Sequence, residues 1–293
     1  MKNLSKLITL IASLSLAAAC STSSKKVANQ DGPRRIIDAH SHTFLLGGTG
    51  GYFEKKPNDV ESAYLKDRNE AGVVASIAHT SNLDKGYINM KKDHVFHCAG
   101  VRPPIKKKEL EKGLKSGKFS CIKIYLGYVP LYATDPTYDP VYSLAEKYQV
   151  PVVFHTGDVF DPNARVKFAD PLLIDDVAVK HRKINFVIAH CGNPWIDTAA
   201  ELAFKNENVY LDGSAFLTGD LDQMPAEKVE ESVIKPLKWI FNYVENPQKL
   251  MFGTDWPLTK TSSYIKPFKA AIPPQYWDDV FYNNAARVFK IKE

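Results

Sequence analysis

Short apolar segments alternate with longer amphipathic segments from residue 34 onward. The short segments are nearly continuous runs of valine, isoleucine and phenylalanine, which is typical of parallel strands that helices cover on both faces. Eight such strands are predicted, with apolar cores at residues 35–38, 73–78, 95–101, 121–125, 152–154, 185–189, 209–212 and 249–253. Helices are predicted between them at 58–71, 106–116, 139–148, 171–181 and 226–245. The pattern therefore indicates an α/β fold.

Eight strands with intervening helices fit a single TIM-type (β/α)8 barrel, although a doubly wound open sheet has the same periodicity. An open dinucleotide-binding sheet would need a glycine-rich loop that opens a helix after its first strand. The glycine-rich segment 47–51 follows the first strand without an evident helix after it, so we interpret it as a flexible loop near the site. Since the sequence contains neither an internal repeat nor a second compact segment, residues 34–293 are predicted to form one barrel domain.

The first nineteen residues have the pattern of a secretory signal, because Lys2 and Lys6 precede an apolar run at 7–16. This run is too short for a membrane-spanning helix, which needs about 20 apolar residues. It leads into Ala-Ala-Ala-Cys at 17–20, which resembles the lipobox of bacterial lipoproteins except that leucine usually stands where Ala17 is. An ordinary secretory signal, cut after an Ala-x-Ala site, is the alternative.

We therefore expect a signal peptide at 1–19, a lipid anchor at Cys20 and a flexible tether at 20–33, which is small and polar. The expected location is the bacterial cell envelope, with the protein anchored to the membrane and facing the periplasm or the exterior. Removing residues 1–19, which hold two lysines and no acidic residue, lowers the formal net charge from +5 to +3. So weak a charge argues against a nucleic-acid partner and favours a small-molecule substrate.

Three cysteines remain beyond Cys20, namely Cys98, Cys121 and Cys191. Their number is odd, and no two of them have Cys-x-x-Cys spacing. We interpret them as buried strand residues and predict neither a disulfide framework nor a zinc cage.

Residues 36–42, Ile-Ile-Asp-Ala-His-Ser-His, carry the strongest local signal for chemistry. Residues two apart on a strand point to the same face, so His40 and His42 would project together from the end of the first strand. Their spacing suits two ligands of one metal ion. Taken alone, a His-x-His pair fits two polar loop residues equally well.

Three further predicted strands also end in a residue that can bind a metal ion or move a proton. His155 ends the fifth strand, His190 ends the sixth, and Asp255 follows the eighth. In a parallel barrel all the carboxyl ends of the strands open on one face, so these side chains would converge there with the His-x-His pair.

The four remaining histidines show whether histidines fall at strand ends only where a site is expected. His79 ends the second strand and is predicted as a peripheral site residue. His94, His97 and His181 fall at the start or inside of a strand or in a charged helix end, and we predict that they are solvated or packed in the core.

Five segments resemble the amidohydrolase superfamily, specifically its amidohydrolase-related branch, which includes metal-dependent decarboxylases and lactonases. They are Asp38-Ala39-His40-Ser41-His42, Phe154-His155-Thr156-Gly157, Ala189-His190-Cys191-Gly192, Gly253-Thr254-Asp255-Trp256-Pro257 and Tyr282-Asn283-Asn284-Ala285-Ala286-Arg287-Val288-Phe289. They occur in the family's order and span nearly all of residues 36–290.

The resemblance implies a divalent metal ion, with zinc as the expected one, held by His40, His42, His155 and Asp255. It also implies that His190 lies beside the ion as a catalytic histidine. Imidazole and carboxylate suit zinc, and a catalytic zinc ion keeps one position open for water, whose pKa it lowers toward about 7. Asp255 would orient this water and take its proton, and His190 would polarise the substrate carbonyl.

Lys123 lies on the fourth strand, on the opposite face from Ile122 and Ile124. A lysine inside a barrel is costly unless it is paired, so three interpretations are open. It could be a cation that meets an anionic substrate or a member of a structural ion pair. The resemblance to binuclear members adds a third, a carbamylated lysine that bridges two metal ions, with His155 and His190 on the second ion.

Several polar and aromatic residues on or just after strand ends are further pocket candidates, for which packing or capping is as good an explanation as substrate contact. They are Thr156, Asp158, Asn193, Trp195, Asp212 and Trp256.

The preferred hypothesis for function is a metal-dependent hydrolase that uses metal-activated water on an ester, lactone or amide. The alternative is a metal-dependent, non-oxidative decarboxylase of an aromatic or unsaturated carboxylic acid, since one scaffold serves both reactions in this family. An exported protein meets esters and lactones more readily than cytoplasmic intermediates, which favours hydrolysis. A non-catalytic binding lipoprotein is the third hypothesis, and the presence of all five expected site residues argues against it.

Overall fold

The structure, a computed structural model, describes residues 32–44 and 59–292. The predicted lipidation at Cys20, the signal peptide, nearly all of the tether and the glycine-rich segment 47–51 lie outside these residues. Among the described residues, no helix has the length and apolar character that a membrane crossing requires.

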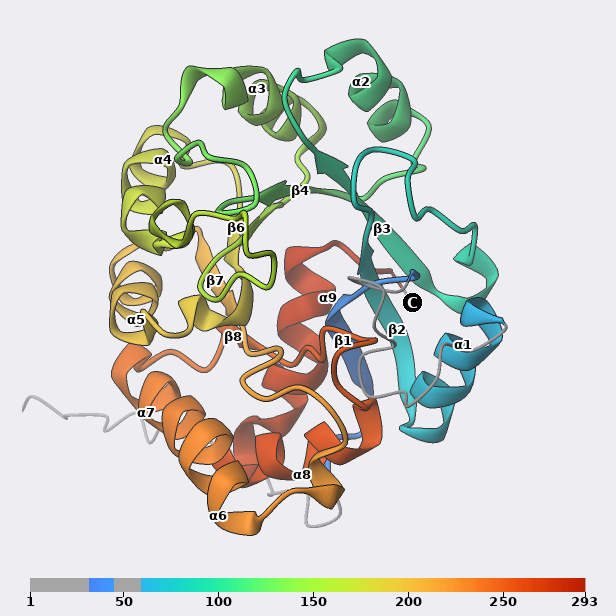
Figure 1. Cartoon of the computed structure of the whole chain (residues 1–293), viewed down its shortest axis with the longest axis vertical. Helices are drawn as coiled ribbons and strands as arrows, with labels where there is room; N and C mark the ends of the chain where they lie inside the picture. The colour runs from blue at the N-terminus through green and yellow to red at the C-terminus, as the bar shows by residue number, and fades with distance from the viewer. Residues whose placement is uncertain (1–31, 45–58, 293) are drawn as a thin grey trace, which may run out of the picture.

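Eight parallel strands form one sheet in the order β1 to β8, and Figure 1 shows them in the centre of the molecule with helices around them. The strands are β1 (Ile36–Ser41), β2 (Val73–His79), β3 (Val95–Val101), β4 (Cys121–Tyr125), β5 (Val152–His155), β6 (Phe186–Ile188), β7 (Val209–Asp212) and β8 (Leu250–Met251). Backbone bonds from Ala39 N to Phe252 O (2.9 Å) and from His42 N to Trp256 O (2.8 Å) join the first strand to the segment after the last. The predicted TIM-type barrel is therefore confirmed, and the open-sheet alternative is wrong.

Within the described residues, helices form in all five predicted segments and in three further segments. They are α1 (Val60–Glu70), α2 (Lys107–Lys115), α3 (Asp139–Tyr148), α4 (Ile174–Lys180), α5 (Ile196–Lys205), α6 (Ala226–Val229), α7 (Lys235–Val244), α8 (Thr261–Ala271) and α9 (Asn284–Val288). The predicted helix at 226–245 consists of α6, a π-helical turn at Glu230–Ile234 and α7. Local capping supports these ends: the side chain of Asp59 accepts from Ser62 N (3.1 Å) before α1.

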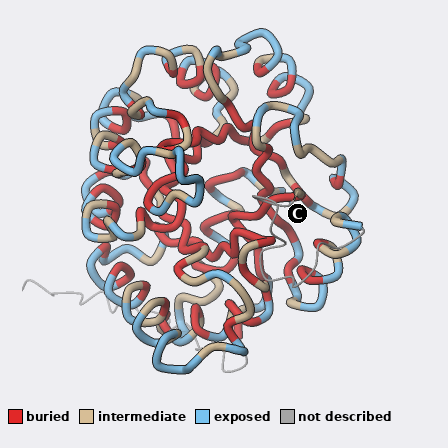
Figure 2. Tube along the Cα trace, in the orientation of Figure 1, coloured by how far each residue is buried: buried red, intermediate tan, exposed pale blue. Residues whose placement is uncertain are grey.

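Alternate residues along each strand belong to two different cores, because successive side chains on a strand point to opposite faces. On β4, Ile122 and Ile124 pack outward against the helices, while Cys121 packs inside the barrel with residues of the other strands. Residues of the C-terminal segment, including Tyr282 and Phe289, join this inner core. Figure 2 shows the buried strands as a red ring inside paler, partly exposed helices. Lys123, in step with Cys121, therefore lies inside the barrel.

A disulfide bond joins Cys98 of β3 to Cys121 of β4, and it corrects the prediction that these cysteines form no disulfide. The two residues are paired directly in the parallel register of these strands, with Cα atoms 4.2 Å apart. Both point into the barrel, which brings their sulfur atoms together although they are 23 residues apart in sequence. Cysteine spacing alone does not show strand register, which is why the sequence did not reveal the pair. Cys191 is buried and free, as predicted.

Candidate functional site

A cavity of about 610 Å³ opens at the carboxyl ends of the strands. The predicted site residues line it together: His40, His42, Lys123, His155, His190 and Asp255. They come from β1, β4 and β5 and from the segments that follow β1, β6 and β8. The convergence predicted from the strand ends is thus what the barrel produces.

His40 of β1 and His42, which follows this strand, are oriented from behind through their Nδ1 atoms. Nδ1 of His40 lies 2.8 Å from Oδ2 of Asp212, and Nδ1 of His42 lies 3.1 Å from the carbonyl of His79. A carbonyl and an ionised carboxylate can only accept, so each Nδ1 carries the proton and donates it. Each Nε2 therefore keeps a lone pair, the form in which imidazole binds a metal ion.

His155 and His190 are oriented in the same way. Nδ1 of His155 donates to the carbonyl of Leu126 (3.0 Å), and Nδ1 of His190 donates to Oγ of Ser214 (2.9 Å). The Ser214 hydroxyl in turn donates to Oδ1 of Asp212. The ring centroids of His155 and His190 are 5.3 Å apart, and those of His40 and His190 are 4.8 Å apart. The four rings thus surround one small volume.

Asp255 is placed by an unusual backbone conformation just after β8. Its φ is 59°, in the left-handed region, and its backbone N donates to the carbonyl of His40 (2.7 Å). Asp38 ties the same two segments together, because it accepts from the backbone N (3.0 Å) and Oγ1 (2.6 Å) of Thr254. The end of β8 is therefore held against the end of β1, with the Asp255 carboxylate turned toward the histidines.

Oδ1 of Asp255 lies 3.1 Å from Nε2 of His42 and 3.5 Å from Nε2 of His40. Burial by itself would raise the pKa of this carboxyl, but the neighbouring imidazoles of His40, His42 and His190 outweigh it and lower the pKa to about 2. Burial also holds the pKa values of His40 and His155 well below their ordinary range. At neutral pH the carboxylate of Asp255 is therefore ionised, and the imidazoles of His40 and His155 are neutral.

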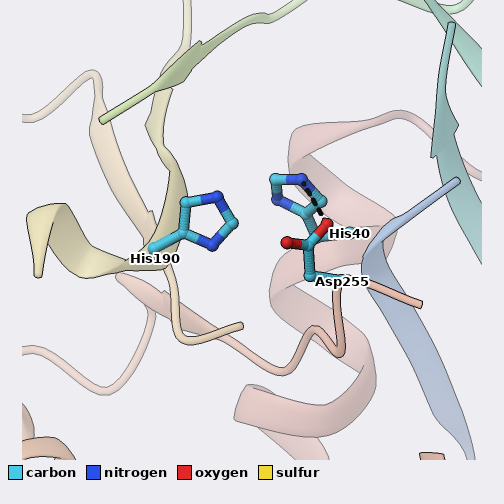
Figure 3. A group of neighbouring side chains, drawn as sticks. All are labelled: His40, His190 and Asp255. Carbon is cyan, nitrogen blue, oxygen red and sulfur yellow. Dashed lines mark ion pairs between the residues drawn. The ribbon is translucent and has the colours of Figure 1, made fainter. Parts of the chain in front are cut away.

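Three of these side chains offer ligand atoms that lie within 4.8 Å of one another, namely His40, His190 and Asp255. Figure 3 shows the ring of His190 facing the other two, which come from β1 and from the segment after β8. The residues fit a divalent metal ion. Within the described residues, the buried Oδ1 of Asp255 has no hydrogen-bond partner, and imidazole nitrogen with carboxylate oxygen is a donor set for zinc and related ions.

The sequence predicts His42 and His155 as ligands and His190 as a catalytic residue, whereas the tightest group in the structure contains His190. His42 and His155 line the same cavity, and His42 lies against Asp255. Which of these histidines bind the metal ion and which one acts in catalysis stays a prediction.

Lys123 is fully buried, with Nζ 3.4 Å from Nε2 of His40. Burial lowers the pKa of its ammonium group to about 8, although the charges of Asp212 and Asp255 oppose this shift. Among the described residues, no carboxylate lies within ion-pair distance of Nζ, which argues against a structural ion pair. A cation for the substrate and a carbamylated bridge both stay open.

The amidohydrolase family model matches residues 37–291. The chain belongs to the amidohydrolase family. This family is metal-dependent, and its enzymes include hydrolases and decarboxylases. A search of the curated proteins found no match.

Solved structures share the amidohydrolase barrel at low sequence identity. An uncharacterised TIM-barrel protein from Bordetella bronchiseptica is 17% identical, with a TM-score of 0.66 over 87% of this chain and 98% of that one. A probable 2-pyrone-4,6-dicarboxylic acid hydrolase from Acinetobacter baumannii is 18% identical, with a TM-score of 0.64 over 88% and 100%. A 5-carboxyvanillate decarboxylase from Novosphingobium aromaticivorans with bound manganese is 13% identical, with a TM-score of 0.55 over 88% and 96%.

The remaining histidines of this amidohydrolase lie as follows. His79 is buried behind the site, with its ring 4.2 Å from that of His40, so it is peripheral as predicted. His97 is buried in β3, while His94 ends a short helical turn and His181 follows α4. None of these three lines the cavity.

Of the further pocket candidates, Asp158 and Asn193 line the amidohydrolase cavity. Asp212 and Trp256 are buried outside its lining, and Asp212 orients the histidines. Thr156 is also buried, with its hydroxyl donating to Ala189 O (2.6 Å), and Trp195 precedes α5.

Sequence reasoning missed several lining residues: Phe44, Ser81, Arg102, Tyr125, Tyr128, Phe160 and Phe216. It also missed Ser214, which links His190 to Asp212. Arg102 follows β3 directly, so the strand-end argument used for the other strands would have found it. Tyr125 is the last residue of β4, whereas the other aromatic residues lie in loops, where hydrophobic periodicity gives no signal.

Proposed function

We propose that this amidohydrolase is a hydrolase that cleaves an ester, lactone or amide bond with water. The observation that carries the proposal is the buried, ionised carboxylate of Asp255 among the Nε2 atoms of His40 and His42, with His190 facing it. A divalent metal ion bound here supplies a water of lowered pKa and a Lewis acid for the substrate carbonyl. His40, His42, His155 and His190 are the imidazoles available to hold it.

Asp255 is the general base of the proposed reaction. Because its pKa lies near 2, it is ionised at neutral pH and accepts a proton from the attacking water. The same proton then becomes available to the leaving oxygen or nitrogen. Retaining a buried charge in this position is costly unless it has a positive partner, and a divalent metal ion held by the neighbouring imidazoles would supply one.

Two residues are placed to meet the negative charge that grows on the carbonyl oxygen. Lys123 presents a buried Nζ next to His40, and donors in such a dry site stabilise an oxyanion strongly. Nδ1 of His190 already donates to Oγ of Ser214, so we assign the stabilisation of this negative charge mainly to Lys123.

Metal analysis of the purified protein and assays on a panel of aryl esters, lactones and amides test this proposal together. We expect about one equivalent of divalent metal, loss of turnover on chelation and recovery on adding zinc or manganese. About two equivalents, together with rescue of Lys123→Ala by short carboxylic acids, would instead indicate a carbamylated bridge. Metal-free protein with full turnover would contradict the proposal.

Decarboxylation of an aromatic or unsaturated acid is the second candidate. It is supported by the similarity to a 5-carboxyvanillate decarboxylase and by Lys123, a buried cation of the cavity that has no carboxylate within ion-pair distance among the described residues. The discriminating assay measures carbon dioxide release from a panel of aromatic acids. Release without turnover of esters or lactones would favour this reaction over hydrolysis.

We further propose that the protein acts outside the cytoplasm, anchored through a lipid on Cys20 after removal of residues 1–19. The Cys98–Cys121 disulfide supports export, because such bonds form and persist in oxidising compartments. Labelling cells with a radioactive fatty acid tests this. We expect label in the wild-type protein and none in Cys20→Ser; a labelled variant, or an unlabelled wild type, would contradict lipidation.

A further inference from the structure

Arg102 is a cation of the cavity wall. It follows β3, is half-buried and lines the cavity. Its Nε donates to the carbonyl of Ser81 (3.2 Å), and its guanidinium lies 4.8 Å from the ring centroid of Tyr125. Among the described residues, no aspartate or glutamate lies within ion-pair distance of it. Because Nε already donates to Ser81, the terminal nitrogens of the guanidinium are the donors left for a ligand.

Backbone carbonyls just after β2 hold this guanidinium and the ring of Tyr125 in place. The carbonyl of Thr80 accepts from the hydroxyl of Tyr125 (2.7 Å), and the next carbonyl, of Ser81, accepts from Arg102. These carbonyls lie directly on β3, where a Cβ on Gly100 would be 2.0 Å from Thr80 O. Glycine at this position lets the two segments touch, so both the cation and the ring beneath it are fixed in place.

The ring of Tyr125 lies near both Arg102 and Lys123, the lysine beside the reacting centre. The ring centroid lies 5.8 Å from Nζ of Lys123, which in turn lies beside His40. Both cations therefore lie beside the same aromatic ring. A substrate whose reacting carbonyl lies at Lys123 can thus place a second polar group at Arg102.

The rest of the wall is consistent with a flat, anionic ligand. Phe44, Tyr128, Phe160 and Phe216 supply aromatic surface around the cavity. Two acidic residues, Asp158 and Asp161, also line it, but both are exposed, where water screens their charge.

We propose that Arg102 binds a carboxylate of the substrate at the end of the cavity remote from the reacting bond. The substrate class is then an aromatic or unsaturated carboxylic acid that carries a hydrolysable ester or lactone. The planar guanidinium matches a carboxylate through two parallel hydrogen bonds, which a lysine would not supply. The reaction part of this inference rests on the proposed hydrolase function, whereas the binding of a carboxylate at Arg102 does not.

A matched pair of substrates measures the contribution of the carboxylate. The aryl ester 3-acetoxybenzoate and its neutral counterpart 3-acetoxybenzamide differ only in the charged group. We expect the wild-type enzyme to favour the anion by about tenfold or more in kcat/KM, the effect of one charge-assisted hydrogen-bonded contact. Arg102→Gln should lose this preference through KM, and Arg102→Lys should keep part of it.

Arg165→Gln is the matched control, since it removes one positive charge from an exposed residue that does not line the cavity. It should keep the wild-type preference. If both variants lost the preference for the anionic substrate equally, the preference would come from the overall positive charge of the protein and not from Arg102. That result would overturn the proposal. An unchanged preference in Arg102→Gln, or none in the wild type, would also overturn it while leaving the hydrolase function intact.

Calorimetric binding of benzene-1,3-dicarboxylate to the metal-loaded protein separates binding from turnover. We expect binding in the wild type and a loss of at least about tenfold in Arg102→Gln, with benzene-1,3-dicarboxamide as the neutral control. If this pattern holds and no ester or lactone is turned over, the proposed function fails and the carboxylate site stands. Equal binding by wild type and a folded Arg102→Gln would refute the site.

Discussion

Nδ1 of His40 lies 2.8 Å from Oδ2 of Asp212, and both side chains are buried. The other oxygen of this carboxylate accepts from the hydroxyl and the backbone N of Ser214, and that hydroxyl accepts from Nδ1 of His190. One carboxylate at the end of β7 therefore fixes the tautomer and the direction of two imidazoles that come from β1 and from the segment after β6. The hydrogen-bond partners of metal ligands affect the affinity for the metal ion as well as the orientation of the ligands.

Asp212→Asn tests this relationship. The amide keeps the size of the side chain but presents one donor where two acceptors are needed, so His40 and Ser214 cannot both be satisfied. We expect metal affinity to fall about 10- to 100-fold, with activity partly restored at high metal concentration. Titration of metal-free protein with zinc measures this. Unchanged affinity would mean that the carboxylate only fills space.

Asp255→Asn should abolish hydrolysis while the barrel stays folded. The change removes the proton acceptor and a candidate ligand together, yet it alters neither the size of the side chain nor the backbone bond from residue 255 to the carbonyl of His40. Turnover and the thermal unfolding midpoint, measured on the same preparation, check the two halves of the prediction. Full activity in a folded variant would refute the assigned role of Asp255.

His97 should make the protein sensitive to acid. Burial lowers its pKa to about 4, while in the unfolded chain it titrates near its ordinary value of 6.5. The unfolded chain therefore binds the proton first, so stability from this residue is complete above about pH 6.5 and declines as the pH falls toward 4. The loss amounts to about 3 kcal/mol at the lower end.

Urea unfolding between pH 4 and pH 7 measures this loss for the wild type and for His97→Gln. We expect the wild-type curve to fall more steeply with acid than that of the variant, even if the variant is less stable at pH 7. Parallel curves would show that other groups dominate the acid response. His94→Gln is a matched control, because His94 is exposed at the end of a helical turn and should leave the slope unchanged.

The Cys98–Cys121 bond should stabilise the barrel without taking part in the reaction. It closes a loop between residues 23 apart, which removes conformational freedom from the unfolded chain. The double change Cys98→Ala with Cys121→Ala should lower the free energy of unfolding by about 2–4 kcal/mol. Denaturant unfolding with and without a reducing agent tests this: the agent should destabilise the wild type and leave the double variant unaffected.

The barrel was predictable from the sequence because its signal is local. Runs of valine, isoleucine and phenylalanine mark each strand, and the predicted bounds of the strands at 95–101, 121–125 and 209–212 match those observed. The candidate site followed from one topological rule, since parallel strands in a barrel all end on the same face. His40, His155 and Asp255 could be grouped without knowing any distance.

Other features depend on register and on side-chain direction. The pairing of Cys98 with Cys121 follows from which residues of β3 and β4 stand opposite one another, and no spacing in the sequence encodes that register. The same holds for Asp212 behind His40, where a strand-end carboxylate might equally have faced a helix end or solvent.

By itself, then, the sequence determined the kind of fold and the set of residues that can do chemistry, because periodicity and strand ends are properties of short segments. Only the tertiary structure decided which imidazole nitrogens face the cavity, which carboxylate accepts from them and where Arg102 stands relative to Lys123. These are relations between segments far apart in the chain, and they exist only once the barrel closes.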